Sequence, residues 1–312
     1  IYYWRIHYQT YKVTHMAPSE ELNTVLEMIR VRSAETRNTI DDERLSYERI
    51  MSTLPIDDDI ETERVGVNGV AAEWIWAPES DKRRVILYLH GGGYVIGSVR
   101  THRVLLAHLA RAAKARVLAL DYRLAPETPF PGPIDDTVNA YQWLLSEGIE
   151  PTNMAIAGDS AGGGLVVAAL VALKSVGEPL PAAGVCISPW SDMESTGGSM
   201  MTNSESDPSV SKERLLKLAG IYLNGKNPQA PLASPIHADL TGLPLLLLQV
   251  GSIDVLLDYS TMLKEHAHKA GVSVQMEVWD DMPHVWHHYA PILPEARKAI
   301  SKIGEFLLQQ TG

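Results

Sequence analysis

Short apolar runs alternate with amphipathic segments over most of the chain from Val85 onward. The runs have the length of strands, and the segments between them carry apolar residues at the three- to four-residue spacing of helices. The strand candidates are Val85–Leu89, Val117–Leu120, Met154–Ala157, Ala183–Ser188, Leu245–Val250 and Val274–Val278. The helix candidates are Arg103–Lys114, Asp135–Ser146, Ala161–Val176, Tyr259–Ala270 and Glu295–Gln309. Such alternation predicts crossover units and an α/β fold with a mostly parallel, buried sheet.

The segment before this alternation has other patterns. Ser19–Met51 is predicted to be helical, with Ser19 as its N-cap. Its apolar residues recur at helical spacing, at Leu22, Val25, Leu26 and Ile29. Arg64–Ala77 alternates like a half-buried strand and contains Asn68-Gly69, a pair typical of a tight hairpin turn. We therefore expect helices followed by a β-hairpin ahead of the parallel sheet.

One later stretch interrupts the alternation of strand and helix candidates. Ser191–Leu240 separates two strand candidates and contains a single predicted helix, Ser211–Leu223. A long insertion in a compact domain is typical of a lid or a binding loop. We divide the chain into a leader or tag at residues 1–15, N-terminal cap helices at 16–60, and an α/β domain at 61–312 with a cap insertion at about 191–240. The leader is dense in tyrosine and lacks the apolar centre of a signal peptide.

Composition narrows the class of protein. The 312 residues are 45% hydrophobic and carry a formal net charge of -11, which suits a globular protein and argues against a nucleic-acid partner. Cys186 is the one cysteine, so no internal disulfide is available, and we expect a reducing, cytoplasmic location. No apolar run approaches the roughly 20 residues of a membrane span, and no membrane partner is predicted.

The sequence Gly158-Asp159-Ser160-Ala161-Gly162 lies between a predicted strand and a predicted helix. A nucleophilic serine on a sharp strand-to-helix turn has this Gly-x-Ser-x-Gly pattern and this context. The helix N-terminus directs N–H groups at developing negative charge. A phosphate-binding loop would instead require a lysine followed by serine or threonine, and here Leu165 follows the glycines. Ser160 is therefore the candidate nucleophile.

A second glycine-rich motif, His90-Gly91-Gly92-Gly93, follows the strand candidate Val85–Leu89. Acyl transfer places negative charge on a carbonyl oxygen, and bare backbone N–H groups must approach that oxygen closely. Glycines allow such an approach, whereas the alternative is a flexible turn. The position at the carboxyl end of a strand favours an anion-stabilising loop.

Together with Asp121–Glu127 (Asp-Tyr-Arg-Leu-Ala-Pro-Glu), these two motifs resemble the hormone-sensitive lipase-like esterases, the bacterial family IV branch of the α/β-hydrolases. The resemblance covers roughly Val85–Gln309. It implies an α/β-hydrolase fold with a mostly parallel eight-stranded sheet and a helical cap, and hydrolysis of short to medium acyl esters without cofactor or metal. It also implies an oxyanion hole made by the N–H groups of Gly92, Gly93 and Ala161.

The acid of a hydrolase triad follows the serine and precedes the histidine in the chain. Asp254 comes just after the strand candidate Leu245–Val250, where sites in such sheets gather. Asp258, Asp280 and Asp281 are rivals by position alone. The resembling family uses the first aspartate of a pair such as Asp254 and Asp258, which favours Asp254.

The histidine candidates after Asp254 are His266, His268, His284, His287 and His288. His266 and His268 fall inside a predicted helix, whereas His284 directly follows the strand candidate Val274–Val278. The resembling family has its histidine on this loop, commonly before glycine and phenylalanine rather than the Val-Trp found here. A metal site formed by His284, His287 and His288 is the alternative, although no other metal-ligand pattern is present.

The substrate and the oligomeric state are less constrained. Tyr94 and Trp190 adjoin the motif strands and are expected to line a substrate pocket, with a core position for Trp190 as the alternative. A homodimer through the strand candidate Val274–Val278, taken as a sheet edge, is also considered. Besides an esterase, a non-catalytic binding protein on the same fold and a related lactonase or amidase fit the motifs. The presence of His284 favours an enzyme.

Overall fold

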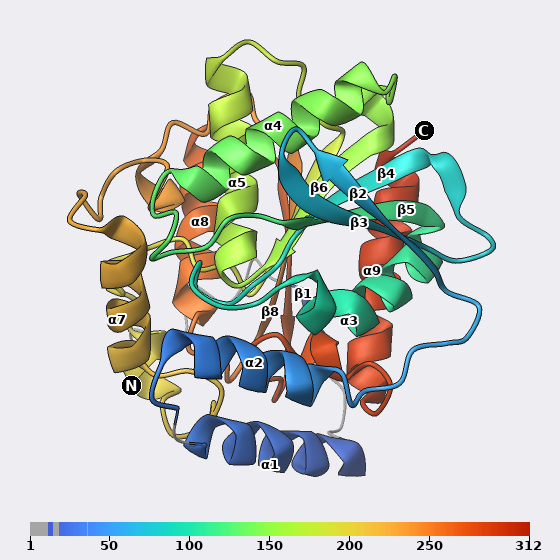
Figure 1. The fold of residues 1–312 in the computed structure, drawn as a ribbon. Coiled ribbons are helices and arrows are strands. Elements are labelled where there is room, and N and C mark those ends of the chain that lie inside the picture. Colours follow the sequence, from blue (N-terminus) through green and yellow to red (C-terminus); the bar gives the residue numbers. More distant parts are fainter. Residues whose placement is uncertain (1–11, 15–18, 36) are drawn as a thin grey trace.

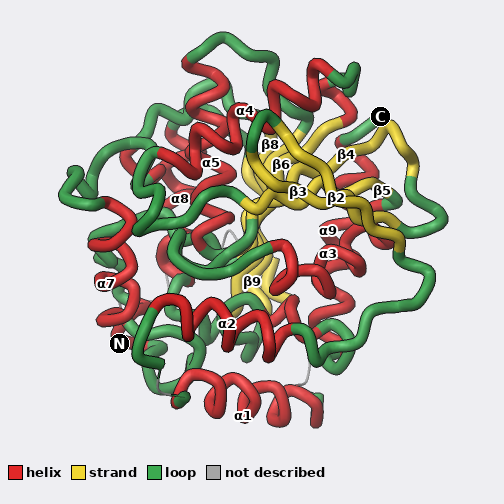
Figure 2. The backbone as a smooth tube through the Cα atoms, viewed as in Figure 1, coloured by secondary structure: helices red, strands yellow, loops and turns green. Residues whose placement is uncertain are grey.

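The computed structural model describes residues 12–14, 19–35 and 37–312, and their strands form one sheet (Figure 2). Its order is β1-β9-β8-β7-β6-β4-β5-β3-β2. The strands are β1 (Lys12–Thr14), β2 (Glu61–Val67), β3 (Val70–Trp76), β4 (Asp81–Leu89), β5 (Ala115–Asp121), β6 (Met154–Asp159), β7 (Ala183–Ile187), β8 (Leu245–Gly251) and β9 (Val274–Trp279). Neighbours from β1 across to β5 are parallel, whereas β3 and β2 pair antiparallel. The predicted mostly parallel sheet of eight strands, β2–β9, is confirmed, and the short β1 extends it.

The predicted helices are present, with starts within four residues of those expected. They are α1 (Glu20–Ala34), α2 (Ile40–Met51), α3 (Val99–Ala113), α4 (Gly132–Ser146), α5 (Ala161–Ser175), α6 (Ser199–Thr202), α7 (Lys212–Leu223), α8 (Leu257–Lys269) and α9 (Pro294–Gln310), with short 3₁₀ turns η2 (Pro151–Asn153), η3 (Pro235–His237) and η4 (Trp286–Tyr289). Helix α3 begins at a capping box, in which Ser98 and Thr101 bond reciprocally to each other's backbone N–H. Because Thr101 stands where a capping box usually has Glu or Gln, the sequence pattern does not predict this start.

Each face of the sheet is covered by its own helices, because successive strand residues point to opposite sides. Along β4, Val85, Leu87 and Leu89 join one buried cluster with residues of α4, α5 and α8. Ile86 and Tyr88 join the other cluster, with residues of α1, α3 and α9. Figure 1 shows α4, α5 and α8 on one side of the sheet and α3 and α9 on the other. Burial on both faces explains why the central strands are continuous apolar runs.

The N-terminal helices lie together near α7, at one end of the sheet (Figure 1). Arg44 of α2 forms a two-bond pair with Glu127, both bonds 2.8 Å long, and donates to the carbonyl groups of Val95 and Ala125. Ser19, at the N-cap position of α1, bonds through its hydroxyl to Glu295 of α9 at 2.9 Å rather than capping its own helix. These contacts anchor α1 and α2 to the sheet domain.

The β-hairpin predicted at Asn68-Gly69 is confirmed, since β2 and β3 pair through Val67 and Val70 with both turn residues at positive φ. The expected free edge at Val274–Val278 is corrected, because Lys12–Thr14 pairs in parallel with β9 at Glu277–Trp279. Of the predicted leader, residues 1–11 and 15 lie outside the described residues. Within the described part of the chain, every helix is too short or too polar to cross a bilayer.

Candidate active site

Ser160 occupies a strained turn between β6 and α5. Its backbone has φ 53° and ψ -119°, a conformation that non-glycine residues rarely adopt. The turn is held by the N–H of Ser160, which donates to Ile187, and by the Ser160 carbonyl, which accepts from Trp190. A Cβ at Gly162 would overlap the carbonyl oxygen of Leu89, so the second glycine of the motif is required by close packing against β4. The predicted strand–turn–helix context of Ser160 is confirmed.

The imidazole of His284 lies between Ser160 and Asp254, which come from three different loops. Its Nε2 is 2.9 Å from the Ser160 Oγ, and its Nδ1 is 3.1 and 3.2 Å from the two Asp254 oxygens. The carboxylate accepts a hydrogen from Nδ1, which leaves Nε2 free to accept the serine proton. The three residues predicted from chain order and strand position therefore converge. An alcohol hydrogen-bonded to an oriented imidazole is the arrangement of an activated nucleophile.

The rival carboxylates lie elsewhere. Asp258 accepts from the N–H of Ser199 at 2.9 Å in the insertion, and Asp281 is exposed. Asp254 is completely buried, and its Oδ1 also accepts from the N–H of Leu256 at 2.7 Å. That bond helps to hold the carboxylate beside the His284 ring.

A second buried carboxylate, Asp207, supports both loops and was not predicted. Its Oδ2 accepts from the N–H groups of His284 and Val255, each at 3.2 Å, so it ties the histidine loop to the residue after Asp254. Burial, followed by the negative charge of Asp254, raises the pKa of Asp207. Asp207 lies in an irregular loop of the insertion, where no periodic pattern marks a buried carboxylate.

Asp207 and Asp254 both act on the imidazole. Burial alone would disfavour the charged form of His284. The charge and hydrogen bond of Asp254, together with the field of Asp207, outweigh burial and raise the pKa of His284 above its ordinary 6.5. The site therefore favours a positive charge on this ring, which is the charge that a base acquires when it takes a proton from a serine.

The loop after β4 faces Ser160. Gly92 and Gly93 line the same pocket as Ser160 and have φ values of 116° and 62°. In the described part of the chain, the N–H groups of Gly92 and Gly93 donate to no protein acceptor. Ala161, as the first residue of α5, has an N–H with no partner inside its helix. These three amides are thus the free donors nearest in sequence to the Ser160 turn and its facing loop.

Asp159, the motif residue before Ser160, holds this glycine loop in place. Its buried carboxylate accepts from the Gly91 N–H at 3.1 Å and from the Tyr88 hydroxyl at 2.8 Å. His102 lies beside it at 3.1 Å. Burial opposes the charge of Asp159, but His102 and the Tyr88 hydroxyl lower its pKa. The sequence motif contained Asp159, yet only its neighbours in space reveal this positioning contact.

The alternative metal site at His284, His287 and His288 is not formed. Among the described residues, these three rings do not bring their nitrogens together. His287 instead bonds through Nε2 to Gln249 at 2.8 Å, and burial lowers its pKa to about 3. His266 bonds to the Ala238 carbonyl at 2.6 Å and does not line the pocket that contains Ser160.

The substrate pocket is lined by other residues than those predicted. Tyr94 and Trp190 are buried in the core, and neither lines the pocket that contains Ser160 and His284. The Tyr94 ring stacks on Tyr222 of α7 with a centroid distance of 3.8 Å. The expectation for Tyr94 is corrected, because its ring packs against Tyr222 in the core, and for Trp190 the alternative of a core position holds.

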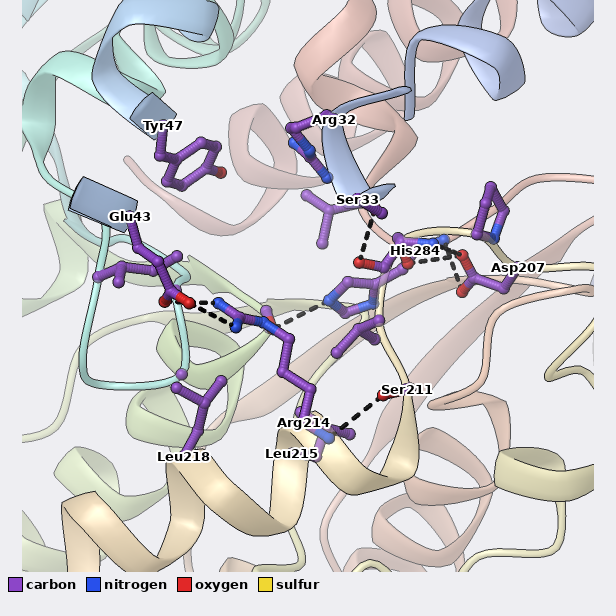
Figure 3. Close-up of a pocket in the computed structure, with 18 of the residues that line it drawn as sticks. Arg32, Ser33, Glu43, Tyr47, Asp207, Ser211, Arg214, Leu215, Leu218 and His284 are labelled. Atoms are coloured by element: carbon purple, nitrogen blue, oxygen red, sulfur yellow. Dashed lines mark hydrogen bonds and ion pairs between the residues drawn. The ribbon is translucent and has the colours of Figure 1, made fainter. Parts of the chain in front are cut away.

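The pocket itself measures about 580 Å³ and is lined in part by residues of α1, α2 and α7 (Figure 3). Arg32 and Ser33 come from α1, and Glu43 and Tyr47 come from α2. The wall contributed by α7 includes Leu215 and Leu218, which Figure 3 shows along that helix. The N-terminal helices and the insertion that carries α7 thus contribute to one pocket with Ser160.

Comparison with known proteins places this site in context. The sequence model of the alpha/beta hydrolase fold matches residues 86–288. An acetyl-hydrolase of Streptomyces hygroscopicus is 46% identical over 294 residues, which are 94% of this chain and 98% of that protein. An esterase crystal structure from the bacterial hormone-sensitive lipase family is 65% identical with a TM-score of 0.94, covering 95% of this chain and 100% of that one. The esterase EstE5, in crystals soaked with p-nitrophenyl butyrate, is 46% identical with a TM-score of 0.90, covering 94% and 99%.

Proposed function

The chain belongs to the bacterial hormone-sensitive lipase family of the α/β-hydrolases and is a carboxylic ester hydrolase, and from this premise we propose that Ser160, His284 and Asp254 hydrolyse short to medium acyl esters through an acyl-enzyme. The observation that carries the proposal is the 2.9 Å contact between the His284 Nε2 and the Ser160 Oγ, with Asp254 on the opposite ring nitrogen. As an ester hydrolase, the chain is not the non-catalytic binding protein considered above.

In the proposed reaction, the same groups act in acylation of Ser160 and in the later release of the acid. His284 takes the hydroxyl proton as Ser160 attacks the ester carbonyl, and it then gives that proton to the departing alcohol. Asp254 holds the ring in one tautomer and stabilises its positive charge. The amides of Gly92, Gly93 and Ala161 would stabilise the negative oxygen of the tetrahedral intermediate. Water then releases the acid from Ser160 by the same steps.

The proposed cap consists of α1, α2 and the insertion that carries α7. Residues of all three line the pocket, and the Arg214–Glu43 ion pair joins α7 to α2 with two contacts of 3.0 Å. A closed cap excludes water from the ester, which strengthens the electrostatic contacts inside. Lactones and amides present the same carbonyl chemistry, so a panel of them belongs beside the esters in any assay.

We predict that acyl-chain preference is set by α7. Leu218 Cδ1 lies 2.6 Å from the position that a Cβ on Gly93 would occupy, so this side chain packs directly over the proposed oxyanion loop. For 4-nitrophenyl esters, kcat/KM should be highest between acetate and hexanoate and about tenfold or more lower for dodecanoate, because a chain too long for the pocket must clash with its wall. Leu218→Ala should move the optimum to longer chains.

The matched control is Leu216→Ala on the same helix, where the side chain is 43% exposed and does not line the pocket. It should leave the chain-length profile unchanged. A wild type that hydrolyses dodecanoate faster than butyrate, or equal profiles for the two leucine variants, would contradict the assignment of Leu218 as the wall.

We also predict the acid side of the pH profile. A general base acts only when neutral, so activity is lost as the pH falls through the pKa of His284. Because Asp254 and Asp207 raise that pKa, the acid limb of kcat/KM should have its midpoint above 6.5. The measurement is the initial rate with 4-nitrophenyl acetate between pH 5 and 9, read at the isosbestic wavelength of nitrophenol. A midpoint below 6.5 would show that burial dominates at His284.

A further inference from the structure

The charged side chains around the active-site pocket are almost all matched by partners. Arg214 pairs with Glu43, and Arg37 pairs with Glu35 at 2.9 Å. The acids Asp159 and Asp207 each accept several hydrogen bonds, as described above. Most charged side chains of the pocket therefore have an ion-pair or hydrogen-bond partner within the protein.

Arg32, in the last turn of α1, is the exception. Among the described residues, its guanidinium makes no ion pair and no side-chain hydrogen bond, and its recorded contact is with the Tyr47 ring, 5.6 Å from the ring centroid. Residues 1–11, 15–18 and 36, which lie outside the described part, contain no aspartate or glutamate in the sequence. In Figure 3, no contact line runs from Arg32, whereas Arg214 is joined to Glu43. The charge of Asp207, in the same pocket, acts on Arg32 without a direct ion pair, so the guanidinium N–H groups remain available to a ligand.

The surroundings of Arg32 suit an anion. Ser33, Tyr47 and Tyr289 line the same pocket as Arg32, so hydroxyl groups accompany the cation. An arginine fork matches the two oxygens of a carboxylate, and partial burial strengthens the contact by reducing the screening of charge by water. Ser160 lines this same pocket, so an ester held at the serine shares one cavity of about 580 Å³ with the guanidinium.

We propose that Arg32 forms an anion subsite, and that the preferred esters are short ones that carry a free carboxylate on the acyl or the alcohol part. The carboxylate pairs with Arg32 while the ester carbonyl lies at Ser160, and hydrolysis releases the acid and the alcohol with addition of one water. This inference rests on the proposed function. It makes Arg32 a specificity residue rather than part of the reacting groups.

The test compares charged and neutral esters of similar size. The pair 4-nitrophenyl hemisuccinate and 4-nitrophenyl butyrate places the charge on the acyl part, and the pair 4-acetoxybenzoate and phenyl acetate places it on the alcohol part. In at least one of the two pairs, Arg32→Gln should lower kcat/KM for the charged ester by about ten- to a hundredfold, mainly by raising KM. The same variant should change kcat/KM for the neutral ester little. Arg32→Lys should retain part of the charged-ester activity.

The matched control is Arg30→Gln on the same helix, where the side chain is exposed and pairs with Glu27. It should leave both ester ratios unchanged. In the wild type, 0.5 M salt should lower the rate for the charged ester relative to the neutral one, a measurement that requires no variant. Equal losses on charged and neutral esters in Arg32→Gln, or a wild-type ratio insensitive to salt, would overturn the anion subsite.

The two proposals fail differently. If the neutral esters are hydrolysed equally well by wild type and by a variant lacking the Ser160 hydroxyl, the proposed function itself is wrong. If neutral esters require Ser160 but the charged esters ignore Arg32, the reaction stands and the anion subsite alone is wrong. Neutral-ester activity in Arg32→Gln also reports that the variant is folded.

Discussion

Replacing Ser160 with alanine is expected to lower kcat for 4-nitrophenyl acetate by about 10⁴- to 10⁶-fold, because no other group in the turn can form the acyl-enzyme. The hydroxyl is the atom that contacts the His284 Nε2 at 2.9 Å, and alanine leaves the ring without that partner. The strained backbone of Ser160 is set by its contacts with Ile187 and Trp190, so the variant should fold. The measurement is kcat from initial rates, with mass spectrometry to detect the acylated wild type and its absence from the variant.

Ser204→Ala is the matched control for this prediction. Ser204 lines the same pocket, is exposed, and bonds to the Met201 carbonyl rather than to a group of the triad. Its replacement should change kcat by less than about threefold, in keeping with ordinary surface substitutions. Residual activity of Ser160→Ala within tenfold of the wild type would mean that another nucleophile, or direct attack by water, carries the reaction.

The parts of the site that the sequence predicts best are those with a local signature. Ser160 lies in a turn whose glycines are required by contacts with the neighbouring strand, and this requirement is visible as a spacing. His284 follows the strand β9, in which apolar residues alternate with Gln275 and Glu277. Both predictions depend on the rule that parallel strands end at one edge of a sheet, and the structure confirms that placement.

The parts that the sequence could not predict depend on packing between distant segments. Asp207 reaches the N–H of His284, 77 residues later in the chain, from a loop without periodicity. Tyr94 adjoins the glycine loop in sequence, yet its backbone conformation places the ring under α7 instead of in the pocket. Position just after a strand therefore identified the reacting groups. It did not identify the pocket wall, which residues of α1, α2 and α7 line.

The pairing of β9 with Lys12–Thr14 is a similar case. A three-residue strand has too few positions to show alternation, so the sequence gives no signal for it. Its consequence is that a dimer formed by simple addition to β9 is blocked along Glu277–Trp279.

Replacing Asp254 with asparagine is expected to lower kcat by about 10⁴-fold while leaving the fold intact, because the amide stabilises the wrong tautomer of His284. The carboxylate accepts from the Nδ1 at 3.1 Å, whereas an amide can present an N–H to that nitrogen and leave the proton on Nε2. An imidazole with its proton on Nε2 cannot accept the hydrogen of Ser160. The loss should therefore appear in kcat far more than in KM.

The pH profile separates this explanation from a simple loss of structure. Asp254 is a principal group that raises the pKa of His284 against burial, so its replacement should lower that pKa and move the acid limb of the residual activity to lower pH. Asp258→Asn is the matched control, since Asp258 bonds to Ser199 in the insertion and should leave the position of the limb unchanged. If Asp254→Asn keeps the wild-type limb while Asp258→Asn shifts it, the acid of the site has been assigned to the wrong aspartate.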